Sequence, residues 1–253
     1  MDRLSRFAKR AAASIPLLLA IGTMIPARAA TPQGVSIQIP GFSMHGDSAS
    51  WTIVILLTLL TLLPALLLSI TPFVRILVVF HFLRQALGTQ STPSNQTLIG
   101  LSLFLTYFLM QPVAAAINQQ ALVPLENGSI TTMEALSRGS APVRQYMLQY
   151  TREKDLALFV EMSREPRPKQ PEDLSMRIVI PAYILSELKT GFQIGAILFL
   201  PFLVIDMVTA SVTTSIGMMQ LPPVVISTPL KILLFVVADG WNLVVGSMLK
   251  SFH

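Results

Sequence analysis

The chain has 253 residues, of which 52% are hydrophobic and only 12% are charged, and its formal net charge is +5. The charged fraction is about half that of an average soluble domain, and the mean hydropathy is +0.63. These values predict an integral membrane or membrane-assembled protein, and the long apolar runs described below predict an all-α fold. The sequence contains no cysteine, which excludes disulfides, thiolate catalysis and cysteine-based metal sites.

Residues 1–29 are predicted to be a cleavable signal peptide. A basic head, Met1–Arg10, precedes an apolar run from Ala11 to Ile25, and an Ala-x-Ala pattern ends at Ala29. This order is typical of a secretory signal cleaved after Ala29 or Ala30; the alternative is an uncleaved anchor. Cleavage would remove five basic residues and Asp2, so that the net charge of +5 becomes +1. The basic pI then reflects targeting, and nucleic acid is not an expected partner.

The rest of the chain is expected to divide into four segments that alternate in polarity. They are an extracytoplasmic tail over 30–50, a first helical hairpin over 51–117, a polar helical extracytoplasmic region over 118–177 and a second helical hairpin over 178–253. With a cleaved signal the mature amino terminus lies outside, so residues 71–97 are expected on the cytoplasmic side and 118–177 outside.

Both hairpins contain apolar blocks that are too long for one span. The run from Trp51 to Leu87 and the run from Ile178 to Met219 would each exceed the hydrocarbon core of a bilayer, which is about 30 Å thick. Prolines are expected to kink or break them. In the first block these are Pro64 and Pro72, and in the second the break is expected at Pro201.

The polar region carries balanced charge. Thr131 and Glu134 have the spacing of a capping box, and Arg138 and Gly139 are expected to close that short helix. An apolar face recurs at helical spacing beyond Ser140. The charges predict a solvated surface without catalytic residues.

The second hairpin holds charges that would be costly in lipid. They are Glu187, Lys189, Asp206, Lys231 and Asp239. A charge at the centre of a span usually faces protein or water. We therefore expect these residues to make contacts between helices or subunits, with Lys231 pairing with Asp206 or with a carboxylate of a neighbouring subunit. Gly191 and Gly195 are expected to allow close helix packing.

Five stretches of this sequence resemble one family. They are RILVVFHFLRQALGTQ over 75–90, NQTLIGLSLFLT over 95–106, PAYILSELKTGFQIG over 181–195, PFLVIDM over 201–207 and PLKILLFVVADGW over 229–241. They resemble the FliP family of flagellar type III export-gate proteins. The injectisome protein SctR shares the pattern, and the signal peptide together with the run over 84–90 favours the flagellar branch.

The resemblance implies a specific function, whereas the composition predicts only a membrane protein. Proteins of this family form a homopentamer that joins FliQ and FliR around a central export pore, with FlhA and FlhB completing the gate. Unfolded flagellar subunits pass through this pore in the bacterial inner membrane, at the flagellar basal body, with part of the assembly on the periplasmic side. The family's methionine-rich loop matches Met218 and Met219, with Gln220 where relatives often carry a third methionine. It implies a gasket that limits leakage.

Other classes of function have weaker support. The three histidines, His45, His81 and His253, have no metal-ligand spacing, and the sequence holds no HExxH, GxSxG or P-loop motif. We predict no enzyme activity, no cofactor and no metal. There are two alternatives. One is a small-molecule or ion transporter whose pathway contains Glu187, Lys189 and Asp206, and the other is a purely structural scaffold.

Overall fold

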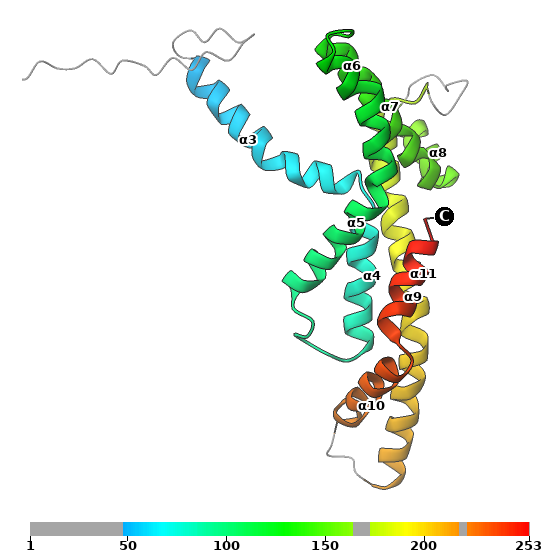
Figure 1. Cartoon of the computed structure of the whole chain (residues 1–253). Coiled ribbons are helices and arrows are strands. Elements are labelled where there is room, and N and C mark those ends of the chain that lie inside the picture. The colour runs from blue at the N-terminus through cyan, green and yellow to red at the C-terminus, as the bar shows by residue number, and fades with distance from the viewer. Residues whose placement is uncertain (1–47, 164–172, 218–221, 253) are drawn as a thin grey trace, which may run out of the picture. The chain divides into compact units, whose positions relative to one another are not determined.

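The computed structural model describes residues 48–163, 173–217 and 222–252. Two compact units divide the chain, 1–56 and 57–253. Of the first unit, only the start of one helix is among the described residues. The second unit holds the other helices, and no strand occurs in the described ranges (Figure 1). The all-α prediction is confirmed.

The helices follow one another with short connections. In chain order they are α3 (Ser48–Ser69), α4 (Phe73–Ala86), α5 (Asn95–Ile117), the π-helix η1 (Asn118–Leu122), α6 (Val123–Glu126), α7 (Thr132–Tyr150), α8 (Glu153–Ser163), α9 (Met176–Ser215), α10 (Pro223–Val237) and α11 (Gly240–Lys250).

Three helical segments in the described ranges are long and apolar enough to cross a membrane. They are Trp51–Ser69, Asn95–Glu126 and Met176–Ser215, and the bent pair α10 and α11, which meet at 67°, is a possible fourth. The longest is α9 with 40 residues, roughly 60 Å at 1.5 Å per residue. That is about twice the thickness of a hydrocarbon core.

Helix α9 is the element against which the second unit packs. Helices α4, α7, α8 and α10 all contact it, and Figure 1 shows α4 and α11 running beside it. One apolar core lies where α4 meets α9, around Ile76, Val79 and Phe80. A second lies between α7 and the start of α9, around Met147 and Tyr183. The two cores lie against different stretches of this long helix.

The predicted break at Pro201 is wrong, and Pro64, where a kink or a break was expected, does not end its helix. Helix α9 continues through Pro201 and α3 continues through Pro64. A proline inside a helix removes one hydrogen bond and costs about 3 kcal/mol. At Pro201 the packing of neighbouring Phe202 against Phe235 of α10 favours continuation. Only Pro72 lies at a boundary, where α3 has ended and α4 begins.

The predicted cap of α7 is confirmed, but its predicted end is wrong. Thr131 is the N-cap, and its hydroxyl accepts a hydrogen bond from the backbone N–H of Glu134 at 3.3 Å. The helix does not close at Gly139 but runs to Tyr150. A Cβ at Gly139 would lie 3.4 Å from the Cβ of Ala121 in η1. This glycine therefore serves close packing against η1 and does not stop the helix.

Candidate functional site

Three charged residues along α9 each face a different neighbouring helix. Glu187 faces α4, Lys189 faces α8 and Asp206 faces α10. Because Glu187 and Lys189 are two residues apart, they project from different sides of the helix. One helix thus holds three others through charged side chains.

The pair of Glu187 and Arg75 is the most deeply buried of these contacts. Arg75 Nε donates to Glu187 Oε2 at 3.0 Å, and Arg75 Nη2 donates to Oε1. The side chain of Arg75 is 3% exposed and that of Glu187 is 0% exposed. A guanidinium that binds both oxygens of a carboxylate fixes distance and orientation together. This pair therefore sets the register of α4 against α9.

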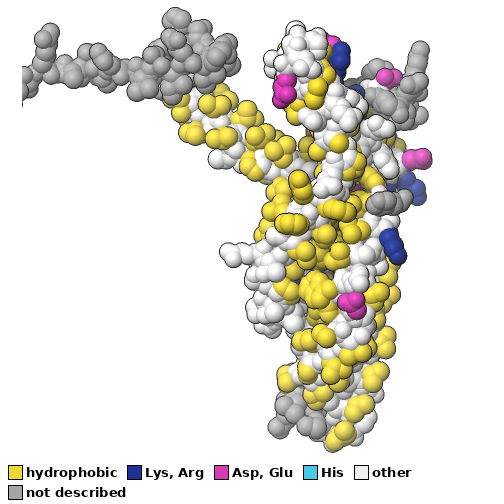
Figure 2. All heavy atoms as spheres, in the orientation of Figure 1, with side chains coloured by type: hydrophobic (Ala, Val, Ile, Leu, Met, Phe, Trp, Pro, Cys, Tyr) yellow, Lys and Arg dark blue, Asp and Glu magenta, His cyan; other side chains and the backbone are white. Residues whose placement is uncertain are grey.

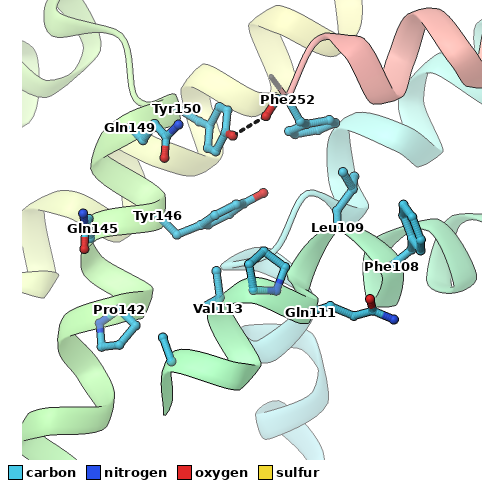
Figure 3. A pocket seen from close by; sticks show the side chains of 12 residues that line it. Phe108, Leu109, Gln111, Val113, Pro142, Gln145, Tyr146, Gln149, Tyr150 and Phe252 are labelled. Carbon is cyan, nitrogen blue, oxygen red and sulfur yellow. Dashed lines mark hydrogen bonds between the residues drawn. The ribbon is translucent and has the colours of Figure 1, made fainter. Parts of the chain in front are cut away.

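Arg75 also holds the residues that follow α11. Its Nη1 atom donates to the carbonyl and the hydroxyl oxygen of Ser251, each at 3.4 Å. Its Cζ lies 4.1 Å from the ring centroid of Phe252, a cation–π distance. The hydroxyl of Tyr150, at the end of α7, donates to the carbonyl of Phe252 at 2.6 Å, as Figure 3 shows. Arg75 thus lies where α4, α7, α9 and the end of α11 meet.

A second polar cluster joins the start of α8 to α9. Asp155 is buried and accepts hydrogen bonds from Lys189 and, at 2.9 Å, from the hydroxyl of Ser186. The Arg152 backbone N–H donates to the Ser186 oxygen at 3.0 Å, and the Arg152 guanidinium to Thr190 at 3.1 Å. Burial by itself raises the pKa of Asp155, but these hydrogen bonds and the charges of Lys189 and Arg152 hold the pKa below its ordinary value. The expectation that this region's charges are only a solvated surface is wrong for Asp155.

The third pair joins α9 to α10. Lys231 Nζ donates to Asp206 Oδ2 at 2.5 Å, one of the two arrangements left open by the sequence. The lysine side chain is 3% exposed and the carboxylate 29%. The other oxygen, Oδ1, is buried without a hydrogen-bond partner among the described residues.

Asp239 differs from the other charged residues that were singled out. It is exposed, and it lies between α10 and α11. Within the described part of the chain no cation forms an ion pair with it. Its carboxylate accepts from the Asn242 side chain at 3.1 Å. The structure does not bring Asp239 to Lys231.

The two glycines of α9 lie against α4. A Cβ at Gly191 would lie 3.2 Å from Val78, and one at Gly195 would lie 2.5 Å from the ring of Phe82. The second distance is shorter than real Cβ contacts allow. The absence of side chains therefore lets α4 and α9 approach closely.

A cavity of about 480 Å³ opens between α5 and α7. Its lining is largely aromatic and aliphatic, with glutamine amides from both helices (Figure 3). Tyr146 is buried in its wall, and the Tyr146 hydroxyl has no hydrogen-bond partner among the described residues. Burial and the negative charge of Glu187 raise the pKa of Tyr146, so the phenol stays protonated at neutral pH. No three acidic or histidine side chains in the described ranges converge on a metal position.

Met218, Met219 and Gln220 lie outside the described residues. The helix bounds place them in the connection between α9, which ends at Ser215, and α10, which begins at Pro223.

Sequence reasoning missed Arg75, Asp155 and Tyr150. Arg75 lies in the first turn of α4, within residues 71–97, for which the sequence predicted only a cytoplasmic location. Its partner is 112 residues away in the chain, and the partner of Lys189 is 34 residues away. The sequence held one indication of these partners: each charged residue of the apolar segment that became α9 requires an opposite charge if it is buried.

Comparison with known proteins identifies the family. A sequence profile of the FliP family matches residues 56–248. The chain is 46% identical over 242 residues to the flagellar biosynthetic protein FliP of Pectobacterium carotovorum subsp. carotovorum, covering 93% of this chain and 92% of that protein. It is 49% identical over 205 residues to FliP of Bacillus subtilis (strain 168), and the match covers 81% of this chain and 93% of that protein. FliP of Caulobacter vibrioides is 44% identical over 250 residues, covering 96% and 92%. The chain therefore belongs to the FliP family and is a flagellar export component.

Proposed function

We propose that this protein is the pore-forming core subunit of the flagellar type III export gate. It passes unfolded flagellar subunits across the bacterial inner membrane, as a homopentamer assembled with FliQ and FliR and completed by FlhA and FlhB. The observation that carries the proposal is identity of 46% with a flagellar biosynthetic protein FliP over more than nine-tenths of both chains.

The exposed apolar surface supports a role within a membrane assembly. The side chains of Trp51–Ser69 are not buried, and exposed large hydrophobic residues continue along α5, α9 and α10 (Figure 2). Such a surface requires lipid or protein around it. The helices α9 and Asn95–Glu126 are also longer than one span needs. In a multi-subunit assembly that extends beyond the bilayer, neighbouring subunits would cover the parts of these helices that project from the membrane. They would also cover the apolar side chains that lipid does not contact.

The proposed gasket consists of Met218, Met219 and Gln220, repeated in every subunit. Methionine is unbranched, flexible and apolar, so a ring of methionines can close an aperture and adapt to varied polypeptide segments. Gln220 adds a polar amide at the third position. We therefore propose that two methionines from each of five subunits provide most of the seal.

The gasket is tested by leakage of a small dye or of ions into cells that carry the complete gate. Replacing Met218 and Met219 together by alanine is expected to increase leakage several-fold. The matched control is Met207→Ala, which shortens a methionine that is 66% exposed on α9 outside the loop and should leave leakage unchanged. Gln220→Met is expected to lower leakage. Unchanged leakage in the double variant would contradict the gasket.

The assembly is tested by purifying the protein with its co-expressed neighbours and measuring the mass of the complex. A complex with five copies of this chain is expected. A stable monomer would contradict the pore.

A further inference from the structure

The junction between α10 and α11 presents one carboxylate in a fixed position. Asp239 has φ of 50° and ψ of 49°, and it is the only non-glycine residue with positive φ in the described ranges. A Cβ at the next residue, Gly240, would overlap the ring of Phe235. The ring of Trp241 packs edge-on against two phenylalanine rings. Its centroid lies 5.5 Å from that of Phe235 and 6.3 Å from that of Phe80. The backbone at Asp239 is therefore held in place because Gly240 and Trp241, which follow it, both pack against Phe235, which precedes it.

The surface around this carboxylate is apolar and exposed. Val236, Val237 and Leu243 are 69%, 77% and 60% exposed. Figure 2 shows hydrophobic side chains over α10 and α11. The bent pair of helices is apolar enough to be a span, and a carboxylate within a span is costly unless it meets a cation or water.

The nearby cations of the chain cannot supply this partner. Lys231 is engaged by Asp206, Lys189 by Asp155 and Arg75 by Glu187. Within the candidate spans of a second copy, the described cations are Lys189 and Lys231, which are already paired, and Arg177 and Lys250, which lie at helix ends. Asp239 also lies in the central part of the bent pair, away from Pro223 and Lys250 at its ends, whereas lipid headgroups lie at the ends of a span. The missing cation therefore belongs to a different protein.

We propose that Asp239 and the apolar face formed by Val236, Val237 and Leu243 dock a membrane helix of another subunit, one that carries a single Lys or Arg among apolar residues. This inference rests on the proposed multi-subunit gate and names the chemistry of one of its contacts. The apolar face supplies the contact area, and the charge pair selects the partner and its register.

The partner is identified by photo-cross-linking in cells with a photoreactive amino acid at Val237. The expected adduct joins this chain to another membrane protein through an apolar peptide that contains one Lys or Arg. Asp239→Asn is expected to lower the adduct yield about tenfold, because the loss of one charge leaves the partner's cation unpaired. Asparagine tolerates the left-handed conformation, so the backbone should be unaffected, and the amount of protein is measured alongside.

A probe at Val204, which is 59% exposed on α9, serves as the matched control, and its adducts should not respond to Asp239→Asn. Replacing the identified partner cation by an uncharged residue should lower the adduct at Val237 to a similar extent, and should add little when it is combined with Asp239→Asn. An adduct with a second copy, with lipid, or with a peptide that lacks a basic residue would overturn the proposal, as would an unchanged yield in Asp239→Asn. An apolar, singly basic peptide from a protein unrelated to flagella would support the docking site and contradict the proposed gate.

Discussion

Two ion pairs of the same chemical type show how burial decides the importance of a residue. Arg75 and Glu187 are 3% and 0% exposed, whereas Arg138 and Glu134, one helical turn apart on α7, are 49% and 46% exposed. Exposed pairs contribute little because water and salt screen them. A buried pair is costly to form but much more costly to break, since one charge is then left without a partner.

Glu187→Gln is therefore expected to destabilise the protein by about 3–5 kcal/mol, because Arg75 would stay buried without a carboxylate. The measurement is the midpoint of heat denaturation of the detergent-solubilised protein, together with its steady-state amount in the membrane. Replacing both residues by apolar ones, as in Arg75→Met with Glu187→Leu, should be less harmful than Glu187→Gln alone.

The matched control is Glu134→Gln on α7, for which we expect a change below about 1 kcal/mol. If the two glutamine variants were equally stable, the pair on α9 would not have the importance that its burial indicates.

Gly195 is expected to tolerate no side chain, whereas Gly100 on α5 should. Gly195→Ala places a Cβ 2.5 Å from Phe82, while nothing lies within 4 Å of a Cβ at Gly100. Overpacking costs about 1–3 kcal/mol, and glycine to alanine in an open helical position gains about 0.4–1 kcal/mol. Melting temperatures should therefore fall for Gly195→Ala and rise slightly for Gly100→Ala. A rise for both would show that α4 and α9 can separate without cost.

At the scale of the element, α8 is attached to α9 through a carboxylate whose ionisation matters. The pKa of Asp155 is held below its ordinary value of 3.8 in the folded protein. Since the folded-state pKa is lower than the unfolded one, its contribution to stability is complete above pH 3.8 and is lost as the pH falls through the lowered pKa. Helix α8 should therefore loosen from α9 only in acid, below pH 3.8.

Hydrogen exchange of residues 153–163, corrected for the intrinsic rate at each pH, measures this loosening. Protection should be constant from pH 7 to pH 5 and should fall below pH 3.8. Asp155→Asn removes the titrating group, so its protection should already be reduced at pH 7 and should depend less on pH. Equal protection in both proteins at pH 7 would contradict a role for the carboxylate.

The elements that could be predicted from sequence are those with a local cause. The apolar runs predicted the helices, and the Thr131 and Glu134 spacing predicted the start of α7. The expected break at Pro201 failed because distant packing against α10 outweighs one lost hydrogen bond. The partners of Glu187 and Lys189 lie far away in the chain and carry no local signal. The break at Asp239 was not predicted either, and beside it the ring of Phe235 leaves no room for a side chain at Gly240.

At the scale of the whole molecule, α9 connects regions of different polarity. Its first half contacts α7 and α8 of the polar region through Tyr183, Ser186 and Lys189. Its second half contacts α10 through Asp206 and Phe202. If the polar region is extracytoplasmic, α9 runs from outside the membrane into it, and the connection between α9 and α10 lies at the far end of the helix from α8.

This arrangement makes a prediction about topology that a chain without cysteine is well suited to test. A single cysteine at Met162, which is 68% exposed on α8, should react with a membrane-impermeant maleimide added from the periplasmic side. A single cysteine at Gln90, exposed between α4 and α5, should react only after the inner membrane is permeabilised. The parent chain is the blank, because it has no thiol to label. The signal peptide predicts this orientation, since its cleavage leaves the mature amino terminus outside. The reverse labelling pattern would place the polar region in the cytoplasm and would contradict both the cleaved signal and the proposed orientation of the gate.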